Sequence, residues 1–166
     1  QAAWLFFPLV LICSVLLQAG TNTISDYYDY INGVDRDYTY GSSRVIVDGL
    51  LPARSLLKAG VILFATATVL GIVLIAARGV GVMILGVIGL MGGFFYTAKP
   101  VGYKYIALGD VMVFILMGPL MVIGSDFVLT GQFHIRALLA SLPVGFLVVA
   151  ILHANNLRDI KHDLDA

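Results

Sequence analysis

The sequence contains no glutamate, so all ten of its acidic residues are aspartates. Only 12% of the 166 residues are charged, against about 25% in typical soluble domains, while 60% are hydrophobic. The formal net charge is zero, which excludes a general electrostatic attraction to nucleic acid. The single cysteine, Cys13, excludes a disulfide framework within the chain or a zinc site built from several cysteines. The long apolar runs that remain predict a membrane protein.

Five apolar stretches are each close to the roughly 20 residues with which a helix crosses the hydrocarbon core. Glycine recurs within them and permits close packing of helices in lipid. The sequence therefore predicts an all-α, multi-span transmembrane helix bundle. Its spans are expected at about 3–22, 56–77, 80–97, 107–125 and 136–156. The chain begins inside an apolar stretch without an initiator methionine, so we expect 1–166 to be one domain that is incomplete at both ends.

Lysine and arginine are concentrated in the segments that five alternating spans place on one side of the membrane. Only Arg78 and Arg136 belong to the other side. The basic residues of the first side are Arg36, Arg44, Arg54, Lys58, Lys99, Lys104, Arg158 and Lys161. Because short cytoplasmic loops carry an excess of basic residues, this side is predicted to be cytoplasmic.

Two aspartate-rich segments follow apolar spans and are predicted on that same side. The first is "NTISDYYDYINGVDRD" at 22–37, and the second is "HANNLRDIKHDLDA" at 153–166. In the first, Asn22, Asp26 and Asp29 are spaced i, i+4 and i+7, so they share one helix face. A turn at Gly33 then leads to Asp35.

In the second segment, Asn155, Asp159 and Asp163 are spaced i, i+4 and i+8, with Asn156 beside them. Like charges four residues apart destabilise a helix, and a bound divalent cation removes that penalty. Asn and Asp oxygens suit Mg²⁺, which commonly takes one or two carboxylates together with substrate phosphates. The two segments are therefore predicted to form one site for magnesium and a diphosphate. Lys99, Arg44 and Arg158 on the same side could hold further phosphate oxygens.

Other interpretations apply to some aspartates and to the chain as a whole. Asp37, Asp48, Asp110 and Asp126 are interpreted as solvated or helix-capping residues. A cation transporter would need acids or bases at the centre of a span, and none of the five predicted spans has one there. The stretch "DGLLPAR" at 48–54 is similar to a CDP-alcohol phosphotransferase motif, but its spacing is one residue too long and the next span lacks aspartate.

Three motifs in order resemble the UbiA superfamily of intramembrane aromatic prenyltransferases. They are "NTISDYYDYINGVD", the element "YTAK" from Tyr96 to Lys99, and "NNLRDIKHD". Within the superfamily, "DYYDYINGVD", "SSRVIVDGLL" and "NNLRD" are most similar to the branch that prenylates 1,4-dihydroxy-2-naphthoate in menaquinone biosynthesis. The resemblance runs along essentially the whole chain.

The resemblance implies a nine-helix fold in a cell membrane, expected to be prokaryotic, with a polyprenyl diphosphate donor, a dihydroxynaphthoate acceptor and Mg²⁺. The implied metal ligands are Asn22, Asp26, Asp29, Asp35, Asn156, Asp159 and Asp163. The implied catalytic residues are Asp29, Asp159, Asp163, Lys99 and Tyr96. Lys99, Arg158 and Arg44 would bind the diphosphate, and Arg44 and His153 would bind the acceptor.

The sequence departs from the family pattern in three places. Ser25 stands where many relatives have asparagine, the step from Asp29 to Asp35 is six residues, and the tyrosine-to-lysine element is short. Which of the first aspartates ligate metal therefore stays open. Other branches of the superfamily, which act on 4-hydroxybenzoate or other acceptors, also remain open because they share the diphosphate site.

Overall fold

The computed structural model describes residues 2–37 and 43–163, with side chains in the last helix described as far as Arg158. The described residues form helices without strands, which confirms the predicted all-α class. A short 3₁₀ turn, η1 (Trp4–Phe6), leads into the long helix α1 (Phe7–Ile31). The other helices are α2 (Ala53–Arg78), α3 (Val80–Phe94), η2 (Tyr103–Ile106), α4 (Gly109–Ile115), η3 (Leu116–Leu120), α5 (Met121–Thr130) and α6 (Ile135–Asp163).

Four helical stretches are long and apolar enough to cross a membrane, as the sequence predicted. They are Trp4–Ile31, Ala53–Arg78, Gly109–Thr130 and Ile135–Arg158. The third expected span, 80–97, instead contains the 15-residue helix α3. At 1.5 Å per residue α3 is about 22 Å long, which is less than the hydrocarbon core.

Glycine residues lie at several of the helix boundaries. Gly79 adopts a left-handed φ of 78° between α2 and α3, and Gly131 does so at 74° after α5. Gly33 has φ 74° two residues after α1 ends, which confirms the turn predicted between Asp29 and Asp35. A side chain other than glycine is strained at such angles, so these positions reverse the chain at low cost.

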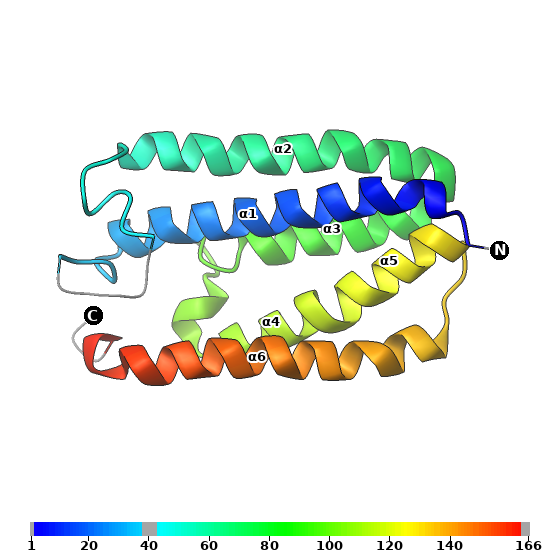
Figure 1. The fold of residues 1–166 in the computed structure, drawn as a ribbon. Helices are drawn as coiled ribbons and strands as arrows, with labels where there is room; N and C mark the ends of the chain where they lie inside the picture. The colour runs from blue at the N-terminus through cyan, green and yellow to red at the C-terminus, as the bar shows by residue number, and fades with distance from the viewer. Residues whose placement is uncertain (1, 38–42, 164–166) are drawn as a thin grey trace.

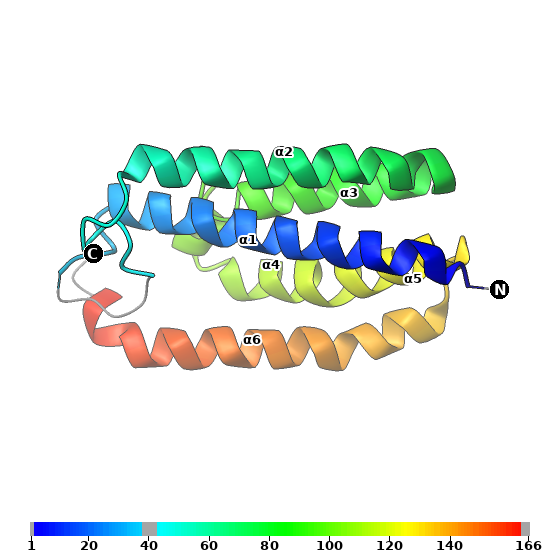
Figure 2. The same cartoon turned by 45° about the horizontal axis from the view of Figure 1, so that its top comes forward.

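The long helices lie side by side and alternate in direction (Figures 1 and 2). The C-terminal ends of α1 and α6, which carry the two aspartate-rich segments, lie at the same end of the bundle (Figure 1). The start of α2 and the segment after α3 lie toward that end as well. We call it the aspartate end. The structure therefore places at one end of the bundle two segments that are more than 100 residues apart in sequence.

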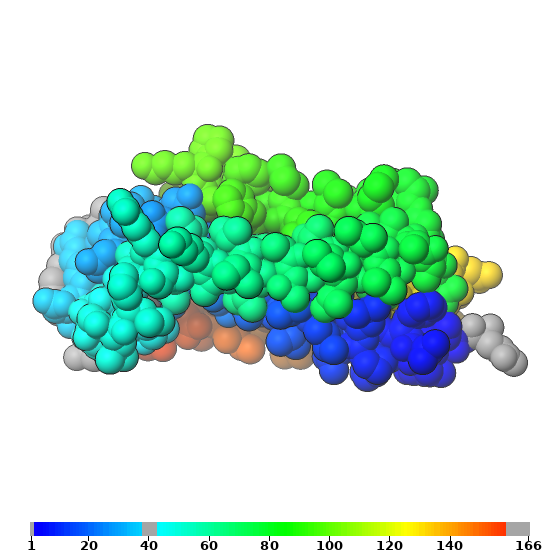
Figure 3. Space-filling view, turned by 90° about the horizontal axis from the view of Figure 1, so that it is seen from above, coloured from blue at the N-terminus to red at the C-terminus, as the bar shows by residue number. Residues whose placement is uncertain are grey.

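Close approaches at small residues hold the helices together. A Cβ atom added to Gly60 of α2 would lie 2.6 Å from Ile24 of α1, and one added to Gly93 of α3 would lie 2.6 Å from Thr21. Large apolar side chains remain exposed on the outer face of α2, including Val61, Ile62, Val69, Ile72 and Val73. Figure 3 shows this face, flanked by α1. Such a surface suits contact with lipid rather than water.

Candidate functional site

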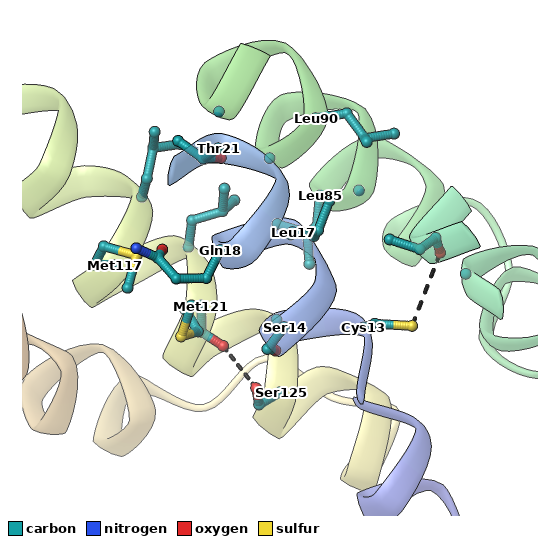
Figure 4. A pocket seen from close by; sticks show the side chains of 18 of the residues that line it. Cys13, Ser14, Leu17, Gln18, Thr21, Leu85, Leu90, Met117, Met121 and Ser125 are labelled. Atoms are coloured by element: carbon teal, nitrogen blue, oxygen red, sulfur yellow. Dashed lines mark hydrogen bonds between the residues drawn. The ribbon is translucent and has the colours of Figure 1, made fainter. Parts of the chain in front are cut away.

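A cavity of about 650 Å³ lies inside the bundle. All six α-helices and η3 contribute to its wall, which is mostly apolar. On α1 the lining runs from Val10 to Asn22, which is about 18 Å along the helix axis. Figure 4 shows Leu17, Leu85 and Leu90 together with Met117 and Met121 around this space. The volume is within the range of pockets that hold small-molecule ligands.

Polar side chains line the part of the cavity nearest the aspartate end. They come from α1, from the segment after α3 and from α6, and they are Gln18, Thr21, Asn22, Tyr96 and Asn155. Gln18 donates a hydrogen bond from Nε2 to Oδ1 of Asn22 at 3.3 Å. The cavity is thus apolar for most of its length and polar toward the end where the aspartates lie.

Asp29 is the most enclosed of the acidic side chains in the described part of the chain, with 5% of its surface exposed. Its Oδ2 atom accepts from the ammonium of Lys104 at 2.7 Å and from the hydroxyl of Ser25 at 3.2 Å. Its Oδ1 atom accepts from the hydroxyl of Tyr105 at 2.8 Å. Because a buried carboxyl group is costly without hydrogen-bond partners, these three donors offset the burial of Asp29.

Burial and the nearby Asp29 side chain shift the pKa values of Lys104 and Tyr105. Burial lowers the pKa of the Lys104 ammonium, but attraction and hydrogen bonding to Asp29 outweigh burial, so the pKa lies above its ordinary value. Burial, and after it the Asp29 carboxylate, raise the pKa of the Tyr105 hydroxyl well above its ordinary value. Burial also raises the pKa of the Tyr96 phenol. Lys104 is therefore a cation and both tyrosines are neutral near neutral pH.

The other residues of the first segment lie around Asp29. Asp26 accepts a hydrogen bond from the Ser43 hydroxyl, and Asp26, Asp35 and Arg44 border one small surface hollow. Arg44 adopts a left-handed φ of 59° and pairs with Asp48 at 2.9 Å. The backbone carbonyl of Asp29 accepts from the N–H groups of Val34 and Asp35, which folds the chain back over the end of α1. Asp26, Asp29 and Asp35 are thus neighbours in space.

The second segment continues α6 toward the same end. Asn155 lines the cavity, whereas Asn156 is not part of its wall. His153 lies 3.5 Å from Asp110 at the start of α4, so Asp110 is paired rather than simply solvated. Asp159 and Asp163 belong to α6, but their side chains lie outside the described residues, so their part in a metal site stays a prediction.

The basic residues of the predicted site differ in their surroundings. Lys99 is exposed and takes part in none of the ion pairs of the described residues, and Arg158 is exposed near the end of α6. The lysine that reaches an aspartate is Lys104, five residues farther along the same loop. Sequence reasoning counted Lys104 for membrane orientation alone and overlooked Ser25, Tyr105 and Gln18 as contributors. The sequence did contain one signal for a role of Lys104 in the site, because its loop is predicted on the same side of the membrane as the aspartate-rich segments.

The groups around Asp29 that could ligate a metal, the carboxylates of Asp26 and Asp35, present oxygen atoms, which suit Mg²⁺ better than a softer transition metal. No group of three or more His, Cys, Asp or Glu side chains in the described part of the chain is arranged to hold a metal ion. Asp29 already shares both oxygens with Lys104, Ser25 and Tyr105. The residue types therefore fit Mg²⁺. In this structure, however, the Asp29 carboxyl group is paired with a cation of the protein itself, Lys104.

Comparisons with known proteins agree with the motifs. The UbiA prenyltransferase family model matches residues 1–166. A relative from Bacillus subtilis (strain 168) named 1,4-dihydroxy-2-naphthoate octaprenyltransferase is 30% identical over 159 residues, which are 96% of this chain and 51% of that protein. UbiA prenyltransferase domain-containing protein 1 of Mus musculus is 34% identical over an alignment of 164 positions that covers 95% of this chain and 48% of the relative. The same-named protein of Dictyostelium discoideum is 32% identical over an alignment of 168 positions that covers 98% of this chain and 51% of the relative.

The chain thus spans about half the length of these curated relatives. No solved structure matches it.

Proposed function

This chain belongs to the UbiA prenyltransferase family, and we propose that it transfers a polyprenyl group from polyprenyl diphosphate to an aromatic acceptor with the help of Mg²⁺. The observation that supports this proposal most strongly is the distribution of polar and apolar side chains along the cavity. Its apolar length suits a prenyl chain, and its polar side chains lie on the side toward the aspartate-rich ends of α1 and α6. A substrate with a hydrocarbon tail and a charged head matches both parts.

The diphosphate would lie at the aspartate end. Bound Mg²⁺ supplies charge neutralisation to the departing diphosphate, and the residues proposed to hold it are Asn22, Asp26, Asp29, Asp35, Asn156, Asp159 and Asp163. The cations Lys99, Arg158 and Arg44 are proposed to bind the remaining phosphate oxygens. Stabilising negative charge as it develops on the leaving group lowers the barrier to breaking the carbon–oxygen bond.

Loss of diphosphate leaves an allylic cation that must be kept from water. The apolar wall excludes water, and Tyr96 presents an aromatic ring to the cavity next to its polar end. An aromatic face attracts a cation, and the raised pKa of the Tyr96 phenol keeps this ring neutral. Tyr27, Tyr28 and Tyr30 also lie in the first segment, but they do not line the cavity, so Tyr96 is the better candidate.

For the acceptor we propose 1,4-dihydroxy-2-naphthoate, so that the product serves menaquinone biosynthesis. The motifs "SSRVIVDGLL" and "NNLRD" and the name of the Bacillus subtilis relative support this choice. The cationic side chain of Arg44, with His153, would hold the acceptor carboxylate. Another aromatic acceptor, such as 4-hydroxybenzoate, is the second candidate because it would use the same diphosphate site.

The distribution of basic residues supports an orientation with the aspartate end in the cytoplasm. We place the protein in a prokaryotic cell membrane, where both the lipid-soluble donor and the acceptor would reach the cavity from the bilayer and its cytoplasmic surface.

The proposal is tested with full-length protein in membranes, a radiolabelled polyprenyl diphosphate and a panel of aromatic acceptors, with Mg²⁺ or with excess EDTA. We expect prenylated product from 1,4-dihydroxy-2-naphthoate with Mg²⁺ and none with EDTA. If product formed from 4-hydroxybenzoate instead, the proposed acceptor would be wrong and the proposed reaction would stand. No labelled product from any acceptor would reject the proposed activity.

A further inference from the structure

The first turns of α2 carry two exposed cations, Arg54 and Lys58. Neither side chain takes part in an ion pair or a hydrogen bond among the residues that the structure describes. Helix α2 contains no acidic residue, and Asp48, the aspartate that precedes it in the chain, is paired with Arg44 at 2.9 Å. Because the two cations are four residues apart on one helix, they face the same side and repel each other. An anion bound to both would remove this repulsion.

Along the rest of α2, the same face of the helix is apolar and exposed. At helical spacing after the two cations come Ile62, Ala65 and Val69. Ile62 and Val69 are each 63% exposed, and Ala65 is exposed as well. This is the face seen in Figure 3. It therefore has a short cationic part at the aspartate end of the bundle and a long apolar part.

Two leucines indicate that the cationic part lies at the surface of the membrane. Leu50 and Leu51, just before α2, are 71% and 46% exposed, and such side chains are more stable in the interfacial layer of a bilayer than in water. With 26 residues, α2 is about 39 Å long. It is thus longer than the hydrocarbon core of about 30 Å. Long side chains near its first residue, such as Arg54 and Lys58, can therefore reach the phosphate groups of the lipids.

We propose that this face of α2 binds an anionic phospholipid of the leaflet at the aspartate end. The lipid phosphate lies between Arg54 and Lys58, and the acyl chains lie along Ile62 and Val69. One negative head group and two hydrocarbon chains match the cationic and the apolar part of the face, whereas a free phosphate ion would match the cations alone. The site is separate from the cavity, whose lining includes neither cation, and the inference does not depend on the proposed reaction.

A second copy of the chain fits this face less well than a lipid. Copies in one membrane share the same orientation, so a symmetric pair through this face would bring its cations together at one level of the bilayer. Two Arg54 and two Lys58 side chains would then repel one another without a counter-ion on either α2. The phosphate of an anionic lipid supplies the opposite charge at that level.

The first test measures binding of phosphatidylglycerol to the purified full-length protein in detergent by native mass spectrometry. Arg54→Gln and Lys58→Gln should each weaken binding about fivefold, the loss expected for one cation at an anionic lipid surface, and the double variant should lose more than either. Arg136→Gln, which removes an exposed arginine from the start of α6, is the matched control and should bind like the wild type. Phosphatidylcholine, which has a phosphate but no net charge, should bind more weakly than phosphatidylglycerol.

A second measurement needs no mutation and remains decisive if the double variant does not fold. The wild-type protein is cross-linked to phosphatidylglycerol that carries a photoreactive group on its head group, and the modified peptides are identified by mass spectrometry. The cross-links should map to residues 50–58. Unlabelled phosphatidylglycerol should compete with them, whereas inorganic phosphate and glycerol 3-phosphate should not, because neither has acyl chains.

Three results would overturn the inference. Equal binding of phosphatidylglycerol by the folded double variant and the wild type would mean that the two cations do not recognise the head group. Cross-links confined to other parts of the chain would mean that something other than this lipid covers the face. Competition by inorganic phosphate as strong as that by phosphatidylglycerol would indicate a site for small anions rather than for a lipid.

Discussion

Gly118 in η3 and Gly145 in α6 bring two helix backbones into direct contact. A Cβ atom built on Gly118 would lie 2.8 Å from the Cα atom of Gly145 and 3.0 Å from the carbonyl oxygen of Ser141. The contact occurs where Pro119 interrupts the hydrogen bonding of the helix and η3 takes a π-helical turn. Since α6 carries the second aspartate-rich segment, this contact helps to fix the position of that segment in the bundle.

Gly118→Ala should destabilise the protein by about 1–3 kcal/mol, because the added methyl group meets backbone atoms that cannot rotate away. The measurement is thermal unfolding in detergent. Gly71→Ala is the matched control: nothing lies within 4 Å of the added atom, and alanine favours the helix over glycine. An equal or higher melting temperature for Gly118→Ala than for the wild type would contradict the described contact.

Arg78 is expected to stabilise the end of the bundle opposite the aspartates. Its guanidinium donates to the carbonyls of Val128 at 2.6 Å and Leu129 at 3.1 Å, and it lies 5.1 Å from the centre of the Phe6 ring. Arg78→Met should cost about 1–3 kcal/mol, because it leaves the last carbonyls of α5 without these donors.

The comparison variant is Arg136→Met, which removes an exposed arginine from the start of α6. Both variants are compared in denaturant-induced unfolding monitored by circular dichroism. If both lower stability equally, the loss of Arg78 acts through net charge rather than through its hydrogen bonds.

Filling the cavity should affect long donors more than short ones. Gly86 lines the cavity and has open space around it, so Gly86→Phe should place a ring inside without disturbing the fold. We expect the ratio of kcat/KM for a long prenyl donor to that for a short one to fall at least about tenfold, a loss of about 1.4 kcal/mol of transition-state binding.

Ala65→Phe adds the same ring on the exposed face of α2, outside the cavity, and should leave that ratio unchanged. Equal loss with both donors in Gly86→Phe would indicate that the prenyl chain follows another path.

Asp159 tests the predicted contribution of α6 to metal binding. Asp159→Ala should lower kcat by about 100-fold or more, because the departing diphosphate would lose a metal ligand. The fold should persist, which thermal unfolding checks. Asp37→Ala removes an exposed aspartate near the same end and should keep wild-type turnover, whereas EDTA should abolish turnover in every variant. Full activity of Asp159→Ala would show that Asp159 is not part of the site.

The placement of the two aspartate-rich segments at the same end of the bundle could be predicted from the sequence because it depends on topology. Four predicted spans separate the two segments, and an even number of spans returns the chain to the same side, whatever the details of packing. Helix α3, with 15 residues, is too short to count as a full span. It nevertheless runs in the direction that returns the chain toward the aspartate end. Helix periodicity likewise predicted that Asn22, Asp26 and Asp29 share a helix, and Gly33 marked the turn after it.

By itself, the sequence determined the helical class, four of the five expected membrane spans and the placement of the aspartate-rich segments at one end, because hydrophobicity, helix spacing and connectivity act locally or through topology. Only the tertiary structure decided which lysine meets Asp29, that Asn155 reaches the cavity, and that His153 pairs with Asp110. Lys99 and Lys104 carry the same charge in the same loop, and no local rule distinguishes them. The choice follows from the left-handed turns at Gly102 and Ala107, which direct Lys104 and Tyr105 back toward a carboxylate 75 and 76 residues away.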